Sequence, residues 1–215
     1  MEDHIKNSSG IQENENHDAD NFRAGSAETQ NTIKIADDLN SNEVLVFTSY
    51  CNVYKIPKKE IYNIRQALEK INLEPGEKPI YVTGDKNYSG FLIVAFENGK
   101  IGKITMSSFS TEYQRKKLRN AFNNESKLIF IERIDNDIDL VTESSIKKVV
   151  LFSTSLINPV ESRTTKGVQV MKQKDGSHMI KVKRADHVRL TEPEYYRKSE
   201  GLNVVGYYLK KEDEV

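Results

Sequence analysis

The sequence predicts an all-β protein: a partial β-propeller of about three four-stranded blades, with one short helix and a disordered N-terminal tail. Short runs of β-branched and aromatic residues, separated by turn residues, fill the chain from residue 44 onward. These runs repeat at a constant spacing, which places Leu45, Ile93 and Val141 at equivalent positions. A repeating unit of roughly 40–50 residues with four short strands has the size of one propeller blade.

Residues 1–40 are expected to form the disordered, acidic tail. The stretch 8–30 is rich in Asn, Glu, Asp, Ser and Gly, and it contains only two larger apolar side chains. Such a segment cannot bury enough apolar surface to offset the entropy of ordering it. A short apolar alternation at residues 32–35 is the exception, and it predicts a strand that pairs with the following domain. The folded domain is expected to span residues 41–215.

Each repeat is expected to open with a β-hairpin. The hairpins are predicted over residues 44–61, 91–109 and 138–157, with turns at 49–51, 97–99 and 143–145. Asn98 and Gly99 give the strongest turn signal, because both residues tolerate the positive φ that a two-residue hairpin turn requires.

Further strands are expected to close each unit. They are predicted at residues 80–84 for the first unit, 127–134 for the second, and 167–173 with 178–184 for the third. In the third unit, Lys174, Asp175 and Gly176 are expected to form a hairpin turn between the two strands, with glycine supplying the left-handed residue.

One stretch departs from the strand pattern. Ile61, Ile64, Leu68 and Ile71 recur at steps of three and four, which is the stripe of an amphipathic helix. We expect a short helix at about residues 58–71. The alternative is an irregular loop whose apolar groups cover the first blade.

The composition excludes several classes of protein. No apolar run approaches the roughly 18–20 residues needed to span a bilayer, which predicts a cytoplasmic protein without a membrane contact. Cys51 is the single cysteine, so a disulfide framework and a cysteine-rich metal site are excluded. Asp135, Asp137 and Asp139 lack the glycine and glutamate that would complete a calcium loop. With scattered histidines and no phosphate-binding P-loop, we predict no catalytic residue, no metal and no cofactor.

The formal net charge of zero conceals an uneven distribution. The chain has 32 basic and 32 acidic residues in total. Residues 1–43 carry 10 acidic and 3 basic side chains, whereas residues 44–190 carry 25 basic and 16 acidic ones. Residues 191–215 carry 6 acidic and 4 basic side chains. An acidic tail beside a basic domain indicates a protein that binds nucleic acid or another polyanion.

The repeats also resemble a known family. FENGKIGKI (96–104), YQRKKLRNAF (113–122) and LINPVESRTTKGVQVM (156–171) are similar to successive blades in the C-terminal β-pinwheel domain of bacterial type IIA DNA topoisomerase A subunits. The similarity is to the A subunits of topoisomerase IV, or to gyrase A-like proteins, of the clostridial type. It covers about residues 40–214, and its most specific element is SRTTKGVQ (162–169).

This resemblance implies a β-pinwheel, a propeller variant whose basic rim binds and bends double-stranded DNA. The implied partners are double-stranded DNA and, in the full enzyme, the topoisomerase catalytic core and B subunit. The implied location is cytoplasmic and nucleoid-associated. This chain lacks the core, so the resemblance implies a non-catalytic part of an ATP-dependent enzyme, either a fragment or a truncated gene product.

The chain also departs from the family pattern. Family pinwheels commonly have five or six blades, and this sequence predicts about three. The glycine-rich basic box of wrapping gyrases is absent, and residues 114–119 keep its charge without its glycines. These departures favour the bending or capture of DNA, as in topoisomerase IV, over wrapping.

Basic residues in the repeats are the candidates for phosphate contacts, because Lys and Arg along a curved rim displace condensed counterions. They are Lys55, Lys58, Lys59, Lys100, Lys103, Arg115, Lys116, Lys117, Arg119, Lys147, Lys148, Arg163 and Lys166. No helix-turn-helix or zinc-finger spacing is present, so binding without sequence preference is expected.

Two alternatives remain open at this point. The first is a propeller-like protein-interaction module that does not bind DNA. The second is an incomplete propeller whose exposed blade edges leave it barely stable by itself.

Overall fold

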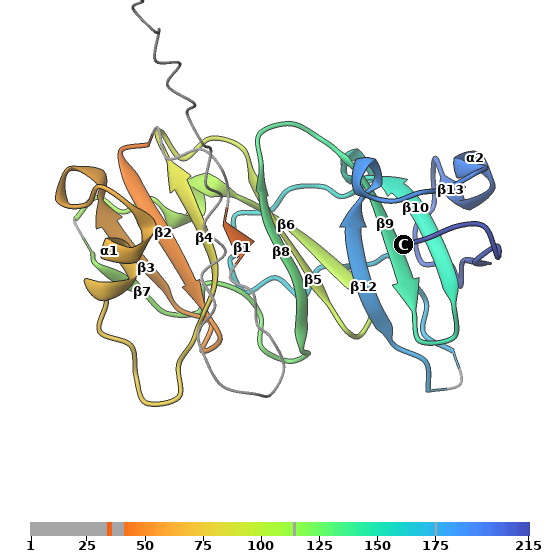
Figure 1. Cartoon of the computed structure of the whole chain (residues 1–215), viewed down its shortest axis with the longest axis horizontal. Helices are drawn as coiled ribbons and strands as arrows, with labels where there is room; N and C mark the ends of the chain where they lie inside the picture. Colours follow the sequence, from red (N-terminus) through yellow and green to blue (C-terminus); the bar gives the residue numbers. More distant parts are fainter. Residues whose placement is uncertain (1–33, 36–40, 114, 175) are drawn as a thin grey trace, which may run out of the picture. The chain divides into compact units, whose positions relative to one another are not determined.

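A computed structural model describes residues 34–35, 41–113, 115–174 and 176–215 (Figure 1). Within it, Ile33–Val215 forms one compact unit. The predicted acidic tail lies outside the described residues, apart from the two residues 34–35. No helix among the described residues is long and apolar enough to cross a membrane.

Three sheets make up the described fold, and each is one blade. The first has the order β1-β4-β2-β3-β7, with β1 Lys34–Ile35, β2 Glu43–Thr48, β3 Val53–Pro57, β4 Pro79–Asp85 and β7 Lys117–Leu118. The second has the order β11-β6-β5-β8, with β5 Phe91–Phe96, β6 Lys100–Thr105, β8 Leu128–Ile134 and β11 Val168–Gln169. The third has the order β12-β9-β10-β13, with β14 also on β10; its strands are β9 Asp139–Ser144, β10 Lys148–Ser153, β12 Met179–Arg184, β13 Arg197–Lys198 and β14 Tyr207–Tyr208.

The central hairpins confirm the predicted repeat and its constant spacing. Their registers pair Leu45 with Lys55, Ile93 with Lys103, and Val141 with Leu151, so each pair recurs one repeat later in the chain. The all-β fold of three blades that the sequence predicted is therefore correct.

The hairpin turns share one backbone conformation, which differs in detail from the prediction. Cys51, Gly99 and Lys147, which stand at the same constant spacing, all have positive φ (56°, 82° and 59°). Each closes a turn by donating its N–H to the carbonyl three residues earlier, at 2.9–3.0 Å. Asn98 does not adopt positive φ, because these are turns with a single left-handed residue. The third turn lies at 145–147, two residues after its predicted place.

The outer strand of each of the first two blades is supplied by the following repeat. β7 pairs with β3 through Val53 and Leu118, although β7 follows the second hairpin in sequence. β11 likewise pairs with β6, through Ile101 and Val168. The prediction that residues 167–173 belong to the third unit and form a hairpin with 178–184 was therefore wrong. A two-residue strand gives no local signal of which sheet it joins.

The third blade obtains its outer strand from the C-terminal segment. β14 pairs with β10 through Val149 and Tyr207, the position that Leu118 and Val168 occupy in the other blades. β13 runs parallel to the same strand further along, with Leu151 opposite Arg197. At the other end of the fold, β1 adds a parallel strand to β4, as the alternation at residues 32–35 predicted.

The predicted helix at 58–71 is shorter than expected. The chain forms a 3₁₀ turn, η1 (Lys58–Glu60), and then the helix α1 (Ile64–Glu69). Ile61 is extended between them, and the side chain of Asn63 caps α1 by accepting a hydrogen bond from the N–H of Gln66 (3.0 Å).

The blades stack through their apolar faces, and both outer faces of the stack are covered (Figure 1). Alternate residues of each strand point to opposite faces, so Val44 packs outward from the first blade while Leu45 packs toward the second. A first cap, residues 61–73 including α1, covers the free face of the first blade. A last cap, residues 185–215, covers the free face of the third blade.

A buried network holds the last cap in place. The carboxylate of Asp213 accepts hydrogen bonds from the main-chain N–H and hydroxyl of Thr191 (2.6 and 2.7 Å) and from the hydroxyl of Tyr196 (2.6 Å). Tyr196 belongs to α2 (Pro193–Tyr196) and is fully buried against the blade. Burial and the hydrogen bond to Asp213 raise the pKa of Tyr196 to about 12. The apolar faces at both ends of the stack are thus covered, as repeat folds require.

Candidate nucleic-acid interface

The outer strands and the loops beside them form three rim segments, one for each blade. We define the first rim segment as residues 115–127, the second as 163–174 and the third as 207–215. Their strands are β7, β11 and β14, which hold equivalent positions on the three blades.

The first rim segment carries the densest basic cluster. Arg115, Lys116 and Arg119 are exposed beside β7. Lys117 is half-buried, and its ammonium donates a hydrogen bond to Glu74 (2.7 Å) and lies 4.8 Å from the centre of the Tyr54 ring. Although partial burial opposes it, the hydrogen bond to Glu74 raises the pKa of Lys117. Lys117 therefore links the first rim segment to the loop that contains Glu74. The other three cations, Arg115, Lys116 and Arg119, face solvent.

The second rim segment contains the SRTTKGVQ sequence (162–169) except for Ser162, and the contacts of Gly167 explain why this loop needs a glycine. Gly167 has a φ of 73°, and a Cβ there would lie 2.5 Å from the carbonyl carbon of Ile101. Only glycine lets the loop approach β6 this closely and then pair as β11. Lys166 is exposed and forms an ion pair with Glu125 (2.8 Å), while Lys100 lies on the adjacent strand, opposite Gln169.

Arg163 joins the first two rim segments. Its guanidinium donates to the carbonyl oxygens of Ser108 (2.7 Å) and Asn120 (3.4 Å). The side chain of Asn123 donates in the reverse direction, to the carbonyl oxygen of Thr164 (3.2 Å). These bonds make the rims of the first and second blades one continuous surface, so Arg163 both positions the surface and adds charge to it.

Lys147 and Lys148 lie at the rim of the third blade, and both have local partners. Lys147 is exposed and forms an ion pair with Glu143 (2.6 Å). The ammonium of Lys148 lies 3.3 Å from the centre of the Tyr208 ring.

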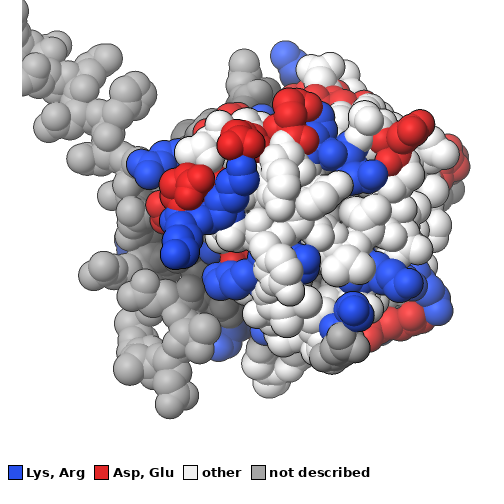
Figure 2. Space-filling view, turned by 90° about the vertical axis from the view of Figure 1, so that its right-hand side faces the viewer, with Lys and Arg blue, Asp and Glu red and all other residues white. Residues whose placement is uncertain are grey.

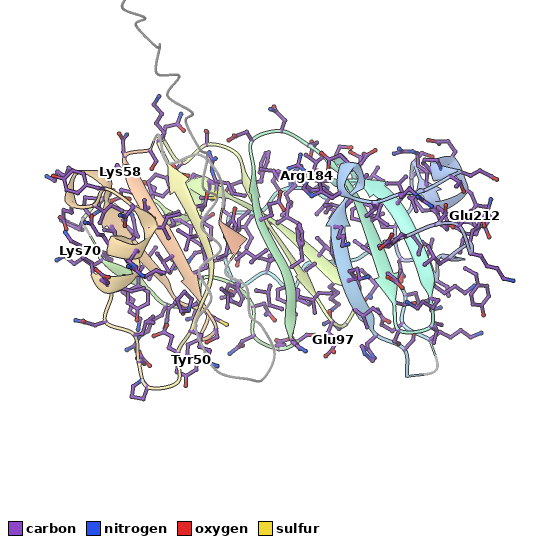
Figure 3. All side chains as sticks on the ribbon, in the orientation of Figure 1. Tyr50, Lys58, Lys70, Glu97, Arg184 and Glu212 are labelled. Atoms are coloured by element: carbon purple, nitrogen blue, oxygen red, sulfur yellow. The ribbon has the colours of Figure 1, made fainter. Side chains whose placement is uncertain are left out.

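Lys58 and Lys59 lie away from the rim. Both belong to η1, which follows β3, whereas β7 pairs near the beginning of that strand. Figure 3 places Lys58 on the side of the fold opposite Tyr50, which lies in the first hairpin turn.

Lys55 and Lys103 are buried, although the repeat had suggested that both belong to the DNA-binding surface. Their exposed fractions are 6% and 3%. The ammonium of Lys55 donates to the carbonyl oxygen of Phe109 (3.2 Å) and that of Lys103 to the carbonyl oxygen of Thr154 (3.3 Å). Each lysine therefore reaches from its own blade to the 3₁₀ turn of the next one, η2 (Met106–Phe109) or η3 (Thr154–Leu156). Buried in these contacts, they are unsuited to phosphate binding.

The buried contact that Lys103 makes with the third blade also fixes a carboxylate. Asp137 accepts hydrogen bonds from Lys103 (2.6 Å) and from the hydroxyl of Thr154 (2.7 Å). Partial burial raises the pKa of Asp137, but these hydrogen bonds outweigh that effect and lower it. Within the run 135–139, Asp137 pairs with Lys103 of the second blade, whereas Asp139 pairs with Arg197 of its own blade. No cluster of potential metal ligands occurs among the described residues.

Sequence reasoning missed three exposed cations of the first two rim segments. Lys127 ends the first rim segment, and Lys172 and Lys174 lie in the second. None stands in a dense basic cluster, so the only signal was their position on the outer strands and adjoining loops.

The comparisons with known proteins agree with this geometry. The sequence is 24% identical over 148 residues, or 65% of this chain, to the DNA gyrase A protein of Staphylococcus aureus strain NCTC 8325 / PS 47. The structure is similar to the C-terminal domain of DNA topoisomerase IV, with a TM-score of 0.62 and 17% identity over 80% of this chain and 60% of that one. This chain has the β-pinwheel fold of those C-terminal domains. The resemblance found in the sequence is thereby confirmed.

A second solved pinwheel supports the same assignment. The C-terminal domain of E. coli ParC matches with a TM-score of 0.59 and 12% identity, over 80% of this chain and 78% of that one. No family model matches the chain. The match spans 17% of the length of the gyrase A protein, so the similarity is to one part of that protein.

Proposed function

We propose that this pinwheel binds double-stranded DNA without sequence preference, through phosphates, and bends it. The observation that carries the proposal is the continuous basic surface formed by the first two rim segments. These segments hold nine basic residues and one acidic residue. Cations along such a rim release counterions from the duplex, and this electrostatic contribution does not depend on base sequence.

We further propose that the pinwheel acts as a non-catalytic part of a type IIA DNA topoisomerase. In that role it would present a bent DNA segment to the catalytic core, which works with the B subunit in the full enzyme. Its similarity to gyrase A and topoisomerase IV domains supports this assignment. The residues 114–119 hold charge without the glycines of a wrapping box, which favours bending or capture over wrapping.

Electrophoretic mobility shifts with duplexes of unrelated sequence test this function. We expect equal affinity for the duplexes, and a uniform loss of affinity when Arg115, Lys116 and Lys117 are changed to Glu. A matched control changes Lys58 and Lys59, which lie away from the rim, and Lys70 of the first cap to Glu. Unchanged affinity of the Arg115, Lys116 and Lys117 variant would instead favour the protein-interaction module.

A further inference from the structure

We infer that the DNA-binding surface ends at the second blade, so that the duplex leaves the protein before it reaches the third rim segment. The inference rests on the proposed function and restricts it to one part of the rim. The inference is based on the three rim segments, which hold equivalent positions on the three blades but differ in charge. The first two are basic and the third is not.

The backbone of the third rim repeats that of the second. Gly206 has a φ of 84°, and a Cβ there would lie 2.7 Å from the carbonyl oxygen of Val149. Gly167 makes the corresponding approach to Ile101, and each glycine is followed by its rim strand, β14 or β11. The third rim therefore has the shape of a DNA-binding rim, and only its side chains can change what it binds.

The main chain also continues from the second rim toward the third blade. Lys172 donates its N–H to the carbonyl oxygen of Val204 (2.8 Å), and Met171 forms an isolated parallel bridge with that same residue. Geometry alone would allow a duplex to continue along the rim at this point.

The charge changes sign between the second rim and the third. The first rim segment has five basic residues and one acidic residue, and the second has four basic and no acidic residues. The third has two basic residues and three acidic ones. A phosphate backbone gains free energy from counterion release only where cations replace those counterions, so the third rim offers it little.

Three of the cations near the third rim already have partners. Lys210 forms an ion pair with Glu192 (2.8 Å), and its ammonium lies 4.8 Å from the centre of the Tyr195 ring. Lys147 is paired with Glu143, and Lys148 lies over Tyr208. A phosphate would have to displace these partners while it approached neighbouring carboxylates.

Two exposed tyrosines form the third rim strand, at the positions that Val168 and Gln169 hold on the second rim. Tyr207 and Tyr208 are 41% and 63% exposed, and the Tyr207 ring packs against Tyr195, with 4.9 Å between ring centres. Figure 2 views this end of the molecule, where charged side chains of both signs surround a broad uncharged area. Such a surface lacks the single positive sign that duplex DNA requires.

Two matched triple variants test the inference through the salt dependence of duplex binding. The first changes Arg115, Lys116 and Arg119 to Gln, and the second changes Lys148, Lys210 and Lys211 to Gln. Each phosphate contact that is lost reduces the slope of log K against log salt by about 1. We expect the first variant to lose about 3 from the slope, and the second to keep the wild-type slope and affinity.

Lysine acetylation of the wild-type protein, read by mass spectrometry with and without a duplex, provides a second test that needs no variant. We expect the duplex to protect Lys116, Lys127 and Lys172 and to leave Lys147 and Lys211 reactive. Protection of Lys147 and Lys211, or an equal loss of slope in both variants, would overturn the inference while leaving DNA binding intact. Failure of the wild-type protein to bind any duplex would instead overturn the proposed function.

Discussion

The environment of Glu77 strongly favours a charge inside the fold. Its carboxylate is buried and accepts hydrogen bonds from the side chains of Asn52 (2.7 Å), Tyr54 (2.9 Å) and Thr48, and from the N–H of Glu74 (2.9 Å). Burial alone raises its pKa, but these hydrogen bonds outweigh burial and lower the pKa to about 2. The residue thereby fixes the loop that follows the first cap to the first hairpin.

We predict that Glu77 makes the stability of the protein depend on pH. Because its pKa is lower in the folded state than in the unfolded one, its contribution is present above about pH 5 and is lost as the pH falls toward 2. The shift corresponds to about 3 kcal/mol. Urea unfolding of the wild type and of Glu77→Gln should differ by about 2–3 kcal/mol at pH 7 and by much less near pH 2.5. A difference that does not change with pH would contradict this role.

A second prediction concerns Gly206, whose close approach to β10 places the third rim strand. Gly206→Ala combines backbone strain with a clash at 2.7 Å, whereas Gly201→Ala has a similar positive φ (61°) and no neighbour within 4 Å. Strain alone costs roughly 1–2 kcal/mol, and we expect the Gly206 variant to lose clearly more. Chemical denaturation of both variants measures this. Equal losses would mean that the close approach is not required.

At the scale of elements, the hairpins could be predicted and the outer strands could not. The hairpin strands carry consecutive apolar residues and recur at a constant spacing, so local pattern and repeat agree. The outer strands β7 and β11 have two residues each, and they join a sheet that lies earlier in the sequence. Their pairing depends on tertiary contacts, which periodicity does not report.

The candidate site could be predicted only in part, because the repeat and the charge density pointed to different residues. Lys55 and Lys103 stand at equivalent positions of the repeat, and this equivalence made them look like rim cations. Equivalence in a repeat says that two residues share an environment, and here that environment is the interface between blades. Charge density, rather than the repeat, pointed to the cluster at 115–119, in which Arg115, Lys116 and Arg119 are exposed and Lys117 is half-buried.

For the whole molecule, the three blades form a stack whose end faces are covered by the first and last caps. Repeat proteins need such end caps because each repeat buries its apolar face only against a neighbour. The apolar positions of the first cap were visible in the sequence as the stripe at 61–71. The last cap lacked a comparable pattern, because its residues pack as short turns around Tyr196 and Asp213.

A third prediction concerns the acidic leader, which we define as residues 1–32 of the tail, and its effect on DNA binding by the whole domain. Residues 1–32 carry seven acidic and two basic side chains, and they are linked to the basic domain through β1. We expect this segment to compete with DNA for the rim, so deleting it should tighten DNA binding at low salt and have little effect at high salt. A full-length variant with amides in place of the seven carboxylates should behave like the deletion. If neither variant changes the affinity, the leader does not compete with DNA for the rim.

The central claim, phosphate binding by a basic rim, is tested most directly by the salt dependence of duplex affinity in the wild-type protein. With about five phosphate contacts on the first two rims, the slope of log K against log salt should be about −4 to −5. Fluorescence anisotropy with a labelled duplex of about 30 bp over roughly 50–200 mM salt covers the informative range. A steep linear decrease of that size is the predicted result, and an affinity that stays flat with salt would contradict the account.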